Sequence, residues 1–260
     1  MLVPSLAPAI APAIAPFVLP PNFAFSAIAA VQISGIFAGT GDTQAPYSKF
    51  AVGQILDAPI PSKLGMLIIY SPAAVYALYA LLQDSWTISS PTLIPLLLIH
   101  FAKRLFETVL VHKYSGSTSL PLASGIGTYY ALVSALIVAT SASTIDPTLQ
   151  TLGLSLFVTG AAGNLYHHIL LSNLRKNKKE DDNFVMPSSG LFKYSAAPHY
   201  LLELIGWLGI GLTSQSINGL LVFALMVRYL SDRARAQNEW NASKFEDWGT
   251  RKKNMIPGVW

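Results

Sequence analysis

The sequence contains no cysteine and few charged residues. Without a thiol, a disulfide framework and thiolate chemistry are both excluded. Charged residues make up 12% of the 260 residues, whereas a soluble domain usually carries about 25%. Hydrophobic residues account for 52% of the chain, and the mean hydropathy is +0.45. This composition indicates that much of the chain lies in lipid rather than in water.

Two common sequence patterns are also missing. No G-x-G-x-x-G follows an expected strand, which excludes a Rossmann site for a dinucleotide. Residues 1–16 are rich in proline and alanine, repeat a PAIAP unit and lack the basic start of a secretory signal. We expect this segment to be an uncleaved, polyproline-like lead-in to one domain formed by residues 17–260.

Apolar runs recur along the rest of the chain. A membrane-spanning helix needs about 20 mostly apolar residues. Seven segments approach this length: residues 17–38, 64–82, 93–110, 127–141, 149–174, 198–212 and 217–230. Only TSQS separates the last two segments, which predicts a tight helical hairpin. The sequence therefore predicts an all-α fold, a polytopic integral membrane bundle of seven transmembrane helices.

The basic residues are distributed unevenly between the loops. With seven spans, all 17 lysines and arginines fall in or beside alternate loops and the C-terminal tail. Residues 83–92, 142–148 and 213–216 contain none. Because cytosolic loops carry an excess of lysine and arginine, we expect a cytosolic C-terminus and a lumenal N-terminus. Six or eight spans would break this alternation.

Polar side chains gather around one basic hairpin, within residues 163–207. Those before the hairpin are Asn164, Tyr166, His167, His168 and Arg175, and those after it are His199, Tyr200 and Glu203. Ionisable residues in membrane spans are costly and usually mark a functional site between helices. Tyr200 and Glu203 share a helix face, so a tyrosine hydroxyl beside a buried carboxylate is a candidate proton donor. The alternative is an interfacial tyrosine with a glutamate that reaches the headgroups.

Two other groups have both a structural and a functional interpretation. The segment HFAKRLFE, residues 100–107, allows Arg104 and Glu107 to pair across one helical turn, either as a structural ion pair or as part of a site. The adjacent His167 and His168 diverge by about 100° on a helix, so they do not resemble a metal site. We expect no metal here, with one histidine directed at a cofactor and the other packed.

Basic residues also gather where the chain would leave the membrane. Arg175 follows the fifth predicted span, whereas Arg233 and Lys252 belong to the C-terminal tail. Such residues either set topology and contact lipid headgroups, or bind the phosphates of a nucleotide. A cofactor with two phosphorylated ends would use both groups. Their position at membrane exits argues against nucleic acid as a partner.

Six ordered segments resemble the steroid 5α-reductase superfamily. They are YSKF, PSKLGMLIIYSPA, HFAKRLFETVLVHKYS, GNLYHHILLSNLR, GLFKYSAAPHYLLELIGW and RARAQNEWNASKFEDW followed by RKKNMIP, and they extend over residues 47–260. The third of these segments is most similar to trans-2-enoyl-CoA reductases and to plant steroid-reductase-like proteins.

The resemblance implies an oxidoreductase of the endoplasmic reticulum membrane that uses NADPH to reduce a C=C bond conjugated to a carbonyl. The substrate stays open between a 4-ene-3-keto steroid, a long-chain 2-enoyl-CoA and a related terpenoid enone. The NADPH pocket would be formed mainly by residues 160–257. The cofactor-binding candidates are Asn164, His168, Arg175, Tyr194, His199, Arg233 and Lys252. The catalytic candidates are Tyr200, Glu203 and, as a second proton donor, Tyr70.

The chain also departs from the steroid enzymes of this superfamily. These have aspartate at His168, asparagine at His199, and histidine and tyrosine at Gln237 and Asn241. Their second-span glutamate falls on Pro59, which moves the predicted acid role to Tyr200. An isoprenylcysteine methyltransferase-like enzyme using S-adenosylmethionine and a non-catalytic lipid-binding relative are the rival interpretations. The two basic groups favour NADPH, because a methyl donor has no 2′-phosphate to bind.

Overall fold

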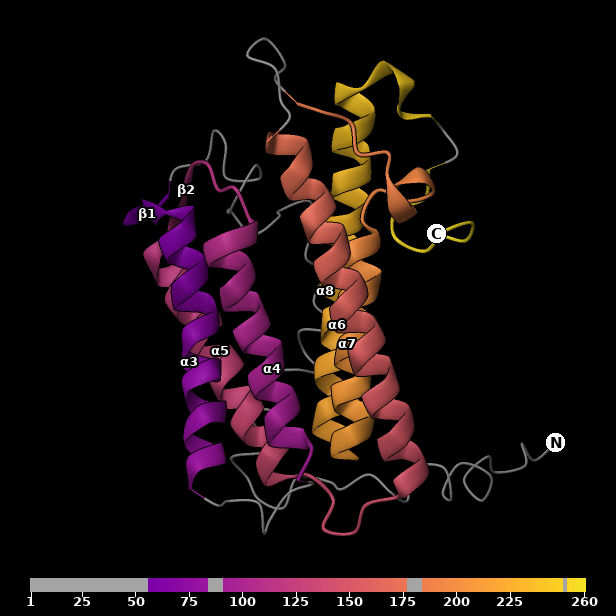
Figure 1. The fold of residues 1–260 in the computed structure, drawn as a ribbon. Helices are drawn as coiled ribbons and strands as arrows, with labels where there is room; N and C mark the ends of the chain where they lie inside the picture. Colours follow the sequence, from indigo (N-terminus) through magenta and orange to yellow (C-terminus); the bar gives the residue numbers. More distant parts are fainter. Residues whose placement is uncertain (1–55, 84–90, 177–183, 250–251) are drawn as a thin grey trace, which may run out of the picture.

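The computed structural model describes residues 56–83, 91–176, 184–249 and 252–260, and these residues are mostly helical (Figure 1). Their helices are α3 (Ser62–Leu82), α4 (Leu93–Phe106), α5 (Leu120–Ala139), α6 (Pro147–Lys176), α7 (Pro198–Ser214) and α8 (Ile217–Lys244). A π-helical turn, η3 (Glu107–Val111), continues α4, and η4 (Gly190–Lys193) and η5 (Glu246–Trp248) are short 3-10 turns. The strands β1 (Pro59–Pro61) and β2 (Ser117–Ser119) pair antiparallel beside the start of α3.

The helices pack in two groups that lie side by side. In the first group α3 packs against both α4 and α5, and in the second α7 packs against both α6 and α8 (Figure 1). Contacts of α4 with α7 and of α5 with α8 join the groups. Phe101 and Trp207 are buried where α4 meets α7, with ring centroids 6.3 Å apart. The apolar core is therefore continuous from α3 to α8.

Glycines bring the backbones of α6 and α7 into direct contact. A Cβ atom at Gly160 would lie 2.3 Å from the backbone nitrogen of Gly206, and one at Gly209 would lie 2.5 Å from that of Phe157. Small residues that allow such close approach are typical of helix pairs in membranes, where van der Waals contact rather than the hydrophobic effect drives association. This contact holds the N-terminus of α7 beside the second half of α6.

The helix boundaries agree with most of the predicted spans. The first predicted span, residues 17–38, and the lead-in of residues 1–16 lie outside the described residues. The fourth span was predicted to begin at residue 127, but α5 begins at Leu120. Ser119 caps this helix by accepting a hydrogen bond from the backbone N–H of Leu122, and Pro121 follows in its first turn. Apolarity alone did not reveal these polar start signals.

The last helix is also longer than predicted. It continues to Lys244 rather than ending at residue 230, because its second half is polar and hydropathy marks only the apolar half. The ends of α4, α6 and α8 lie at one end of the bundle with the starts of α3, α5 and α7 (Figure 1). Lys113, Arg175 and Lys244, which lie at or just after the ends of these helices, therefore share one end. Which side of a membrane this end faces stays a prediction.

Among the described helices, α3 and α5 are long and apolar enough to cross a membrane, judged by length and composition. The described residues are therefore consistent with an all-α membrane protein. The count of seven spans and the orientation of the termini stay predictions.

Candidate active site

A buried carboxylate lies at the centre of the polar residues in the bundle. Glu107, the first residue of the π-helical turn after α4, has no solvent exposure. One of its oxygens pairs with Lys103 Nζ at 2.8 Å and the other with Arg104 Nη1 at 2.5 Å. A buried charge is tolerated when it is paired in this way. The predicted pair of Arg104 and Glu107 is confirmed, with Lys103 as a third member.

The π-helical turn fits the functional interpretation of this segment. Such turns occur mostly as single insertions in α-helices, frequently at functional sites. Here the turn extends α4 from Glu107 to Val111 and ends at His112, whose backbone N–H donates to the Glu107 carbonyl at 2.8 Å. The wider turn changes which side chains face α6 after Arg104. Regular helical spacing would not predict this change.

Arg104 connects the carboxylate to α3. Its Nη2 donates to the hydroxyl of Tyr70 at 2.6 Å, and the guanidinium lies 4.8 Å from the centre of the Tyr70 ring. Tyr70 is buried and stacks on Tyr130 of α5. A hydrogen bond from a cation stabilises negative charge on a phenol oxygen. This arrangement suits a tyrosine that releases a proton or polarises a carbonyl.

Lys103 connects the same carboxylate to α6 and α7. Its Nζ donates to Asn164 Oδ1 at 2.5 Å, and Asn164 Nδ2 donates to the His199 carbonyl at 2.9 Å. Asn164 is 1% exposed, so both ends of its amide need these partners. The sequence grouped Asn164 with His199 but did not predict that α4 supplies the residue between them and Glu107.

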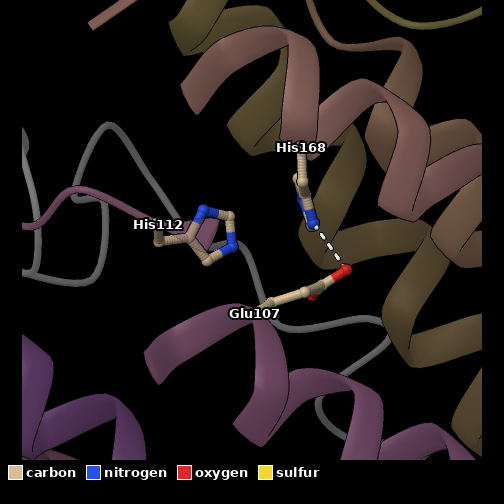
Figure 2. A group of neighbouring side chains, drawn as sticks. All are labelled: Glu107, His112 and His168. Carbon is tan, nitrogen blue, oxygen red and sulfur yellow. Dashed lines mark ion pairs between the residues drawn. The ribbon is translucent and has the colours of Figure 1, made fainter. Parts of the chain in front are cut away.

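Three side chains converge beside the π-helical turn: Glu107, His112 and His168. Figure 2 shows His112 and His168 converging with Glu107. His168 Nδ1 lies 3.1 Å from Glu107 Oε1 and 3.4 Å from Arg104 Nη1. The His112 and His168 rings are 4.6 Å apart between centroids. Burial first, and then the nearby His168 and Arg104, lowers the pKa of His112 to about 3.

This trio has the dimensions of a metal site. The candidate ligand atoms of Glu107, His112 and His168 all lie within 4.8 Å of one another. Both carboxylate oxygens are, however, already bound to the cations of Lys103 and Arg104. A divalent ion would add positive charge beside these two groups, which opposes its binding. The donor set therefore fits a hydrogen-bonded histidine cluster better than a metal centre.

The neighbouring His167 has a different role. Its Nδ1 lies 2.7 Å from the Gly163 carbonyl, and its Nε2 accepts a hydrogen bond from the Leu191 N–H at 3.2 Å. Gly190 adopts φ +58° against this ring, and a Cβ there would lie 3.2 Å from Nε2. His167 therefore holds the loop before α7, while His168 faces Glu107. The adjacent histidines do point in different directions.

Glu203 pairs with α4 rather than with the hydroxyl of Tyr200. Its Oε1 lies 3.6 Å from His100 Nε2, and the His100 ring packs edge-on against Trp207 with centroids 4.8 Å apart. The Tyr200 and His199 rings instead lie together, with ring centroids 4.2 Å apart. Tyr200 also packs against the apolar cluster that contains Met255. The expected pairing of the Tyr200 hydroxyl with Glu203 is therefore not among the described contacts. Although the two residues are one helical turn apart on α7, their side chains contact different neighbours.

The remaining candidates lie at the basic end of the bundle. Arg175 is exposed and donates to the backbone carbonyl of Lys113. Tyr194 is 56% exposed, whereas Arg233 is 3% exposed and lies over the Tyr229 ring. Lys252 donates to the Pro187 carbonyl at 3.3 Å and lies 3.9 Å from the centre of the Trp248 ring.

The C-terminal tail closes onto the start of α7. The backbone N–H groups of Ala196 and Ala197 donate to the carbonyls of Lys253 and Asn254 at 2.8 and 3.0 Å. Asn238 of α8 donates to the Lys252 carbonyl at 3.2 Å and accepts from the Trp248 indole at 2.7 Å. The tail therefore brings Lys252 to the same end of the bundle as Arg175 and Arg233.

Several buried polar atoms at this end are compatible with a polar ligand. Among the described residues, no partner is found for His199 Nδ1, Ser195 Oγ or Asn241 Nδ2. Asn241 is 1% exposed, and its other amide atom accepts from Gln237 Nε2 at 2.7 Å. Buried polar groups normally have partners, so unsatisfied ones indicate a missing ligand or water. With the basic side chains nearby, these atoms fit an anionic, hydrogen-bonding cofactor.

The sequence predicted five residues that the structure brings together in or beside the Glu107 cluster. These residues are Tyr70, Asn164, His168, His199 and Glu203. It left open whether the segment of residues 100–107 lines the site, and it did not single out His112. The sequence places His112 shortly after that segment. The direction of the His112 side chain, however, depends on the π-helical turn that lies between them.

The fold and this site define a helical protein of membrane type with a buried, cation-rich polar centre. The family model for 3-oxo-5-alpha-steroid 4-dehydrogenase matches residues 119–260, more than half of the chain. The chain therefore belongs to the 3-oxo-5-alpha-steroid 4-dehydrogenase family, as the resemblance predicted.

The curated relatives have names of three kinds. The chain is 34% identical over 107 residues to 3-oxo-5-alpha-steroid 4-dehydrogenase 1 of Rattus norvegicus, over 41% of this chain and 40% of that protein. It is 29% identical over 174 residues to a probable very-long-chain enoyl-CoA reductase of Caenorhabditis elegans, over 62% and 56%. It is 31% identical over 130 residues to polyprenal reductase 2 of Oryza sativa subsp. indica, over 47% and 36%.

The chain matches about 40% of the length of the steroid enzymes among its curated relatives. The family model identifies the family, and the names of these relatives describe a dehydrogenase and two reductases.

Proposed function

We propose that the protein is an NADPH-dependent reductase of the C=C bond of an α,β-unsaturated carbonyl lipid, acting in the membrane of the endoplasmic reticulum. The observation that carries the proposal is the convergence of Tyr70, Asn164, His168 and His199 around the buried Glu107 cluster, between otherwise apolar helices. An apolar surrounding suits the lipid, and the polar centre suits the reacting carbonyl.

The residues for the cofactor are those at the basic end of the bundle. Arg175 and Lys252 would hold phosphates, while Arg233 and Tyr194 would contact the rest of the nucleotide from α8 and from the loop before α7. His199 and Asn164, which lie deeper, would contact the nicotinamide end. Burial lowers the pKa of Lys252, which disfavours its charged form. A phosphate bound beside it would raise this pKa and favour the charged form. NADPH supplies a hydride when bound.

The chain's own residues would then control charge and protons. Reduction of the substrate at its β-carbon would shift the electron pair of the C=C bond toward the carbonyl oxygen. Donors that are already oriented stabilise this oxygen most effectively, because they need no reorganisation. The α-carbon then takes a proton from an acid, which gives the saturated carbonyl compound.

Two tyrosines are candidates for this acid. We assign the proton donor to Tyr200, at the start of α7, and an alternative donor is Tyr70. The hydrogen bond from Arg104 supports Tyr70, since it stabilises the phenolate. The contact with the His199 ring supports Tyr200, since it places an ionisable group beside the phenol. Separate phenylalanine variants distinguish the two.

Three classes of α,β-unsaturated carbonyl lipid are candidate substrates. Names of relatives include a steroid dehydrogenase, an enoyl-CoA reductase and a polyprenal reductase. We propose that this chain reduces one of the corresponding substrates: a 4-ene-3-keto steroid, a long-chain 2-enoyl-CoA or a polyprenal-like terpenoid enone.

Protein purified in detergent tests the proposal with NADPH and each enone in turn. The expected result is NADPH oxidation that depends on one of the enones, with deuterium from labelled NADPH appearing at the β-carbon of the product. Binding of a lipid without turnover would support a non-catalytic relative instead. Transfer of a methyl group from S-adenosylmethionine would contradict the proposal.

A further inference from the structure

A hollow lies between α7, α8 and the C-terminal tail, and we call it the α7–α8 groove. Its volume is about 370 Å³, within the range of roughly 300–1,000 Å³ that is usual for small-molecule sites. The side chains that line it come from three segments. They are four aliphatic residues from Leu201 to Leu208 on α7, three residues from Phe223 to Ser231 on α8, and three in the tail within residues 255–260.

Helical spacing explains why these side chains form one groove. The lining positions on α7 recur every three or four residues and those on α8 every four, so each set lies on one helix face. The two helices are consecutive and reverse direction after Ser214, which brings Leu201 near the level of Ser231 and Leu208 near that of Phe223. Seven residues extend over about 10 Å of helix. The groove therefore runs about this far from the basic end toward the middle of the bundle.

The lining of the groove selects an apolar ligand. None of the described residues that line it carries a charge, and Ser231, at the basic end, supplies its one hydroxyl group. A charged or strongly polar ligand would lose its hydration here without gaining partners. A hydrocarbon loses nothing by this exchange.

Tyr200 lies between the groove and the polar centre. It is one helical turn before Leu204, and it packs against the apolar cluster that contains Leu204 and Met255, which both line the groove. Glu203 and Trp207, on the other side of Tyr200 around α7, contact α4 instead. Tyr200 is also half-buried. The groove is therefore continuous with the residue proposed as the acid.

We propose that the α7–α8 groove holds the linear hydrocarbon chain of the substrate, with the reacting carbonyl beside Tyr200. This inference rests on the proposed function and selects among its substrate classes. The groove is partly open to its surroundings, so a chain longer than about 10 Å can continue beyond it into lipid. A rigid steroid ring system cannot bend along the two helices in this way. The groove therefore favours a 2-enoyl-CoA or a polyprenal-like enone.

The tail supports this arrangement because it forms one wall of the groove. The backbone N–H groups of Met255 and Ile256 donate to the Trp260 carbonyl at 3.0 and 2.8 Å, so the last residues form a compact turn. The same tail carries Lys252, which we propose for a cofactor phosphate. The chain of the substrate and the dinucleotide would therefore occupy adjoining sites at the start of α7.

The first test fills the groove by Leu208→Trp in the full chain. Leu208 is half-buried at the deep end of the groove, so a larger ring would occupy the place of the chain. Long and short enones of one kind are compared: trans-2-hexadecenoyl-CoA with crotonyl-CoA, and farnesal with 3-methyl-2-butenal. For the long member kcat/KM should fall by about tenfold or more, since each buried methylene strengthens binding by up to about fourfold. For the short member, whose chain ends before Leu208, it should change by less than about twofold.

Leu132→Trp in α5 is the matched control. Leu132 is 53% exposed, so the same ring is added outside the groove, and wild-type rates are expected with long and short enones. NADPH affinity, measured by fluorescence titration, should be unchanged in both variants.

Photolabelling of the wild-type protein tests the site without a substitution. Hexadecenoyl-CoA and farnesal analogues with a diazirine near the end of the chain are bound and irradiated, and the labelled peptides are identified by mass spectrometry. The expected label lies within residues 201–208, 223–231 or 255–260. Excess unlabelled long-chain enone should remove it, whereas the short enone should not. This measurement decides the question if L208W does not fold.

The outcomes separate the groove from the proposed function. Wild-type protein that oxidises NADPH with none of the enones overturns the proposed function. Reduction of a 4-ene-3-keto steroid but of no chain enone overturns the groove alone. The groove is also overturned if L208W loses rate equally with long and short enones, if it loses none, or if the label lies only outside the three segments.

Discussion

Arg104 of α4 donates a hydrogen bond to the hydroxyl of Tyr70 in α3 at 2.6 Å. The same guanidinium pairs with Glu107 at 2.5 Å. Arginine suits this position because its planar fork can serve two partners at once. One side chain therefore connects a candidate acid in the first group of helices to the charged centre that faces the second group.

Removing the charge of Glu107 should destabilise the protein. In Glu107→Gln the buried cations of Lys103 and Arg104 lose their shared partner. Breaking a buried ion pair from one side costs about 3–5 kcal/mol. Chemical unfolding in detergent measures the change. Glu239→Gln is the control, because Glu239 forms an exposed pair with Arg235 at 4.0 Å, and its removal should change stability by less than about 1 kcal/mol.

Tyr200→Phe should lower kcat by about a hundredfold or more, as expected for loss of a positioned general acid. NADPH affinity should change little, since the lost contact acts mainly in the transition state. Steady-state kinetics and a fluorescence titration measure the two quantities. If Tyr70→Phe lowers kcat this strongly and Tyr200→Phe does not, the acid role belongs to Tyr70.

Arg175→Ala should weaken NADPH binding more than NADH binding. A hydrogen bond to a charged group contributes about 1.5–3 kcal/mol, so the dissociation constant of NADPH should rise by about tenfold or more. Fluorescence titration with both dinucleotides measures the difference. Lys244→Ala, a change of an exposed residue at the end of α8, should affect neither. Equal weakening of both dinucleotides by Arg175→Ala would reject a role in binding the 2′-phosphate.

Gly160→Ala should destabilise the pair formed by α6 and α7. The added Cβ would lie 2.3 Å from the Gly206 backbone nitrogen, so the helices must separate. Overpacking of this kind costs about 1–3 kcal/mol. Gly125→Ala in α5 is the control, since nothing lies within 4 Å of its added Cβ and alanine favours a helix by about 1 kcal/mol. Thermal unfolding of the two variants should move in opposite directions.

Hydropathy accounts for much of the fold. Apolar runs of nearly the right length predicted the six described helices, because a helix in lipid must satisfy its own backbone hydrogen bonds. It did not predict the start of α5 at Leu120 or the polar half of α8. Those boundaries depend on a serine cap and on a helix that continues beyond an apolar segment.

Residue type alone determined that this chain carries ionisable groups within apolar helices, and that Asn164, His168, His199 and Glu203 belong to one region. Only the tertiary structure decided that α4 supplies the centre of that region, that His168 rather than His167 faces it, and that Tyr200 and Glu203 have different partners. The physical reason is that contacts between helices depend on rotation about each helix axis. One π-helical turn after Phe106 and glycine contacts between α6 and α7 set these rotations, and no local pattern in the sequence encodes them.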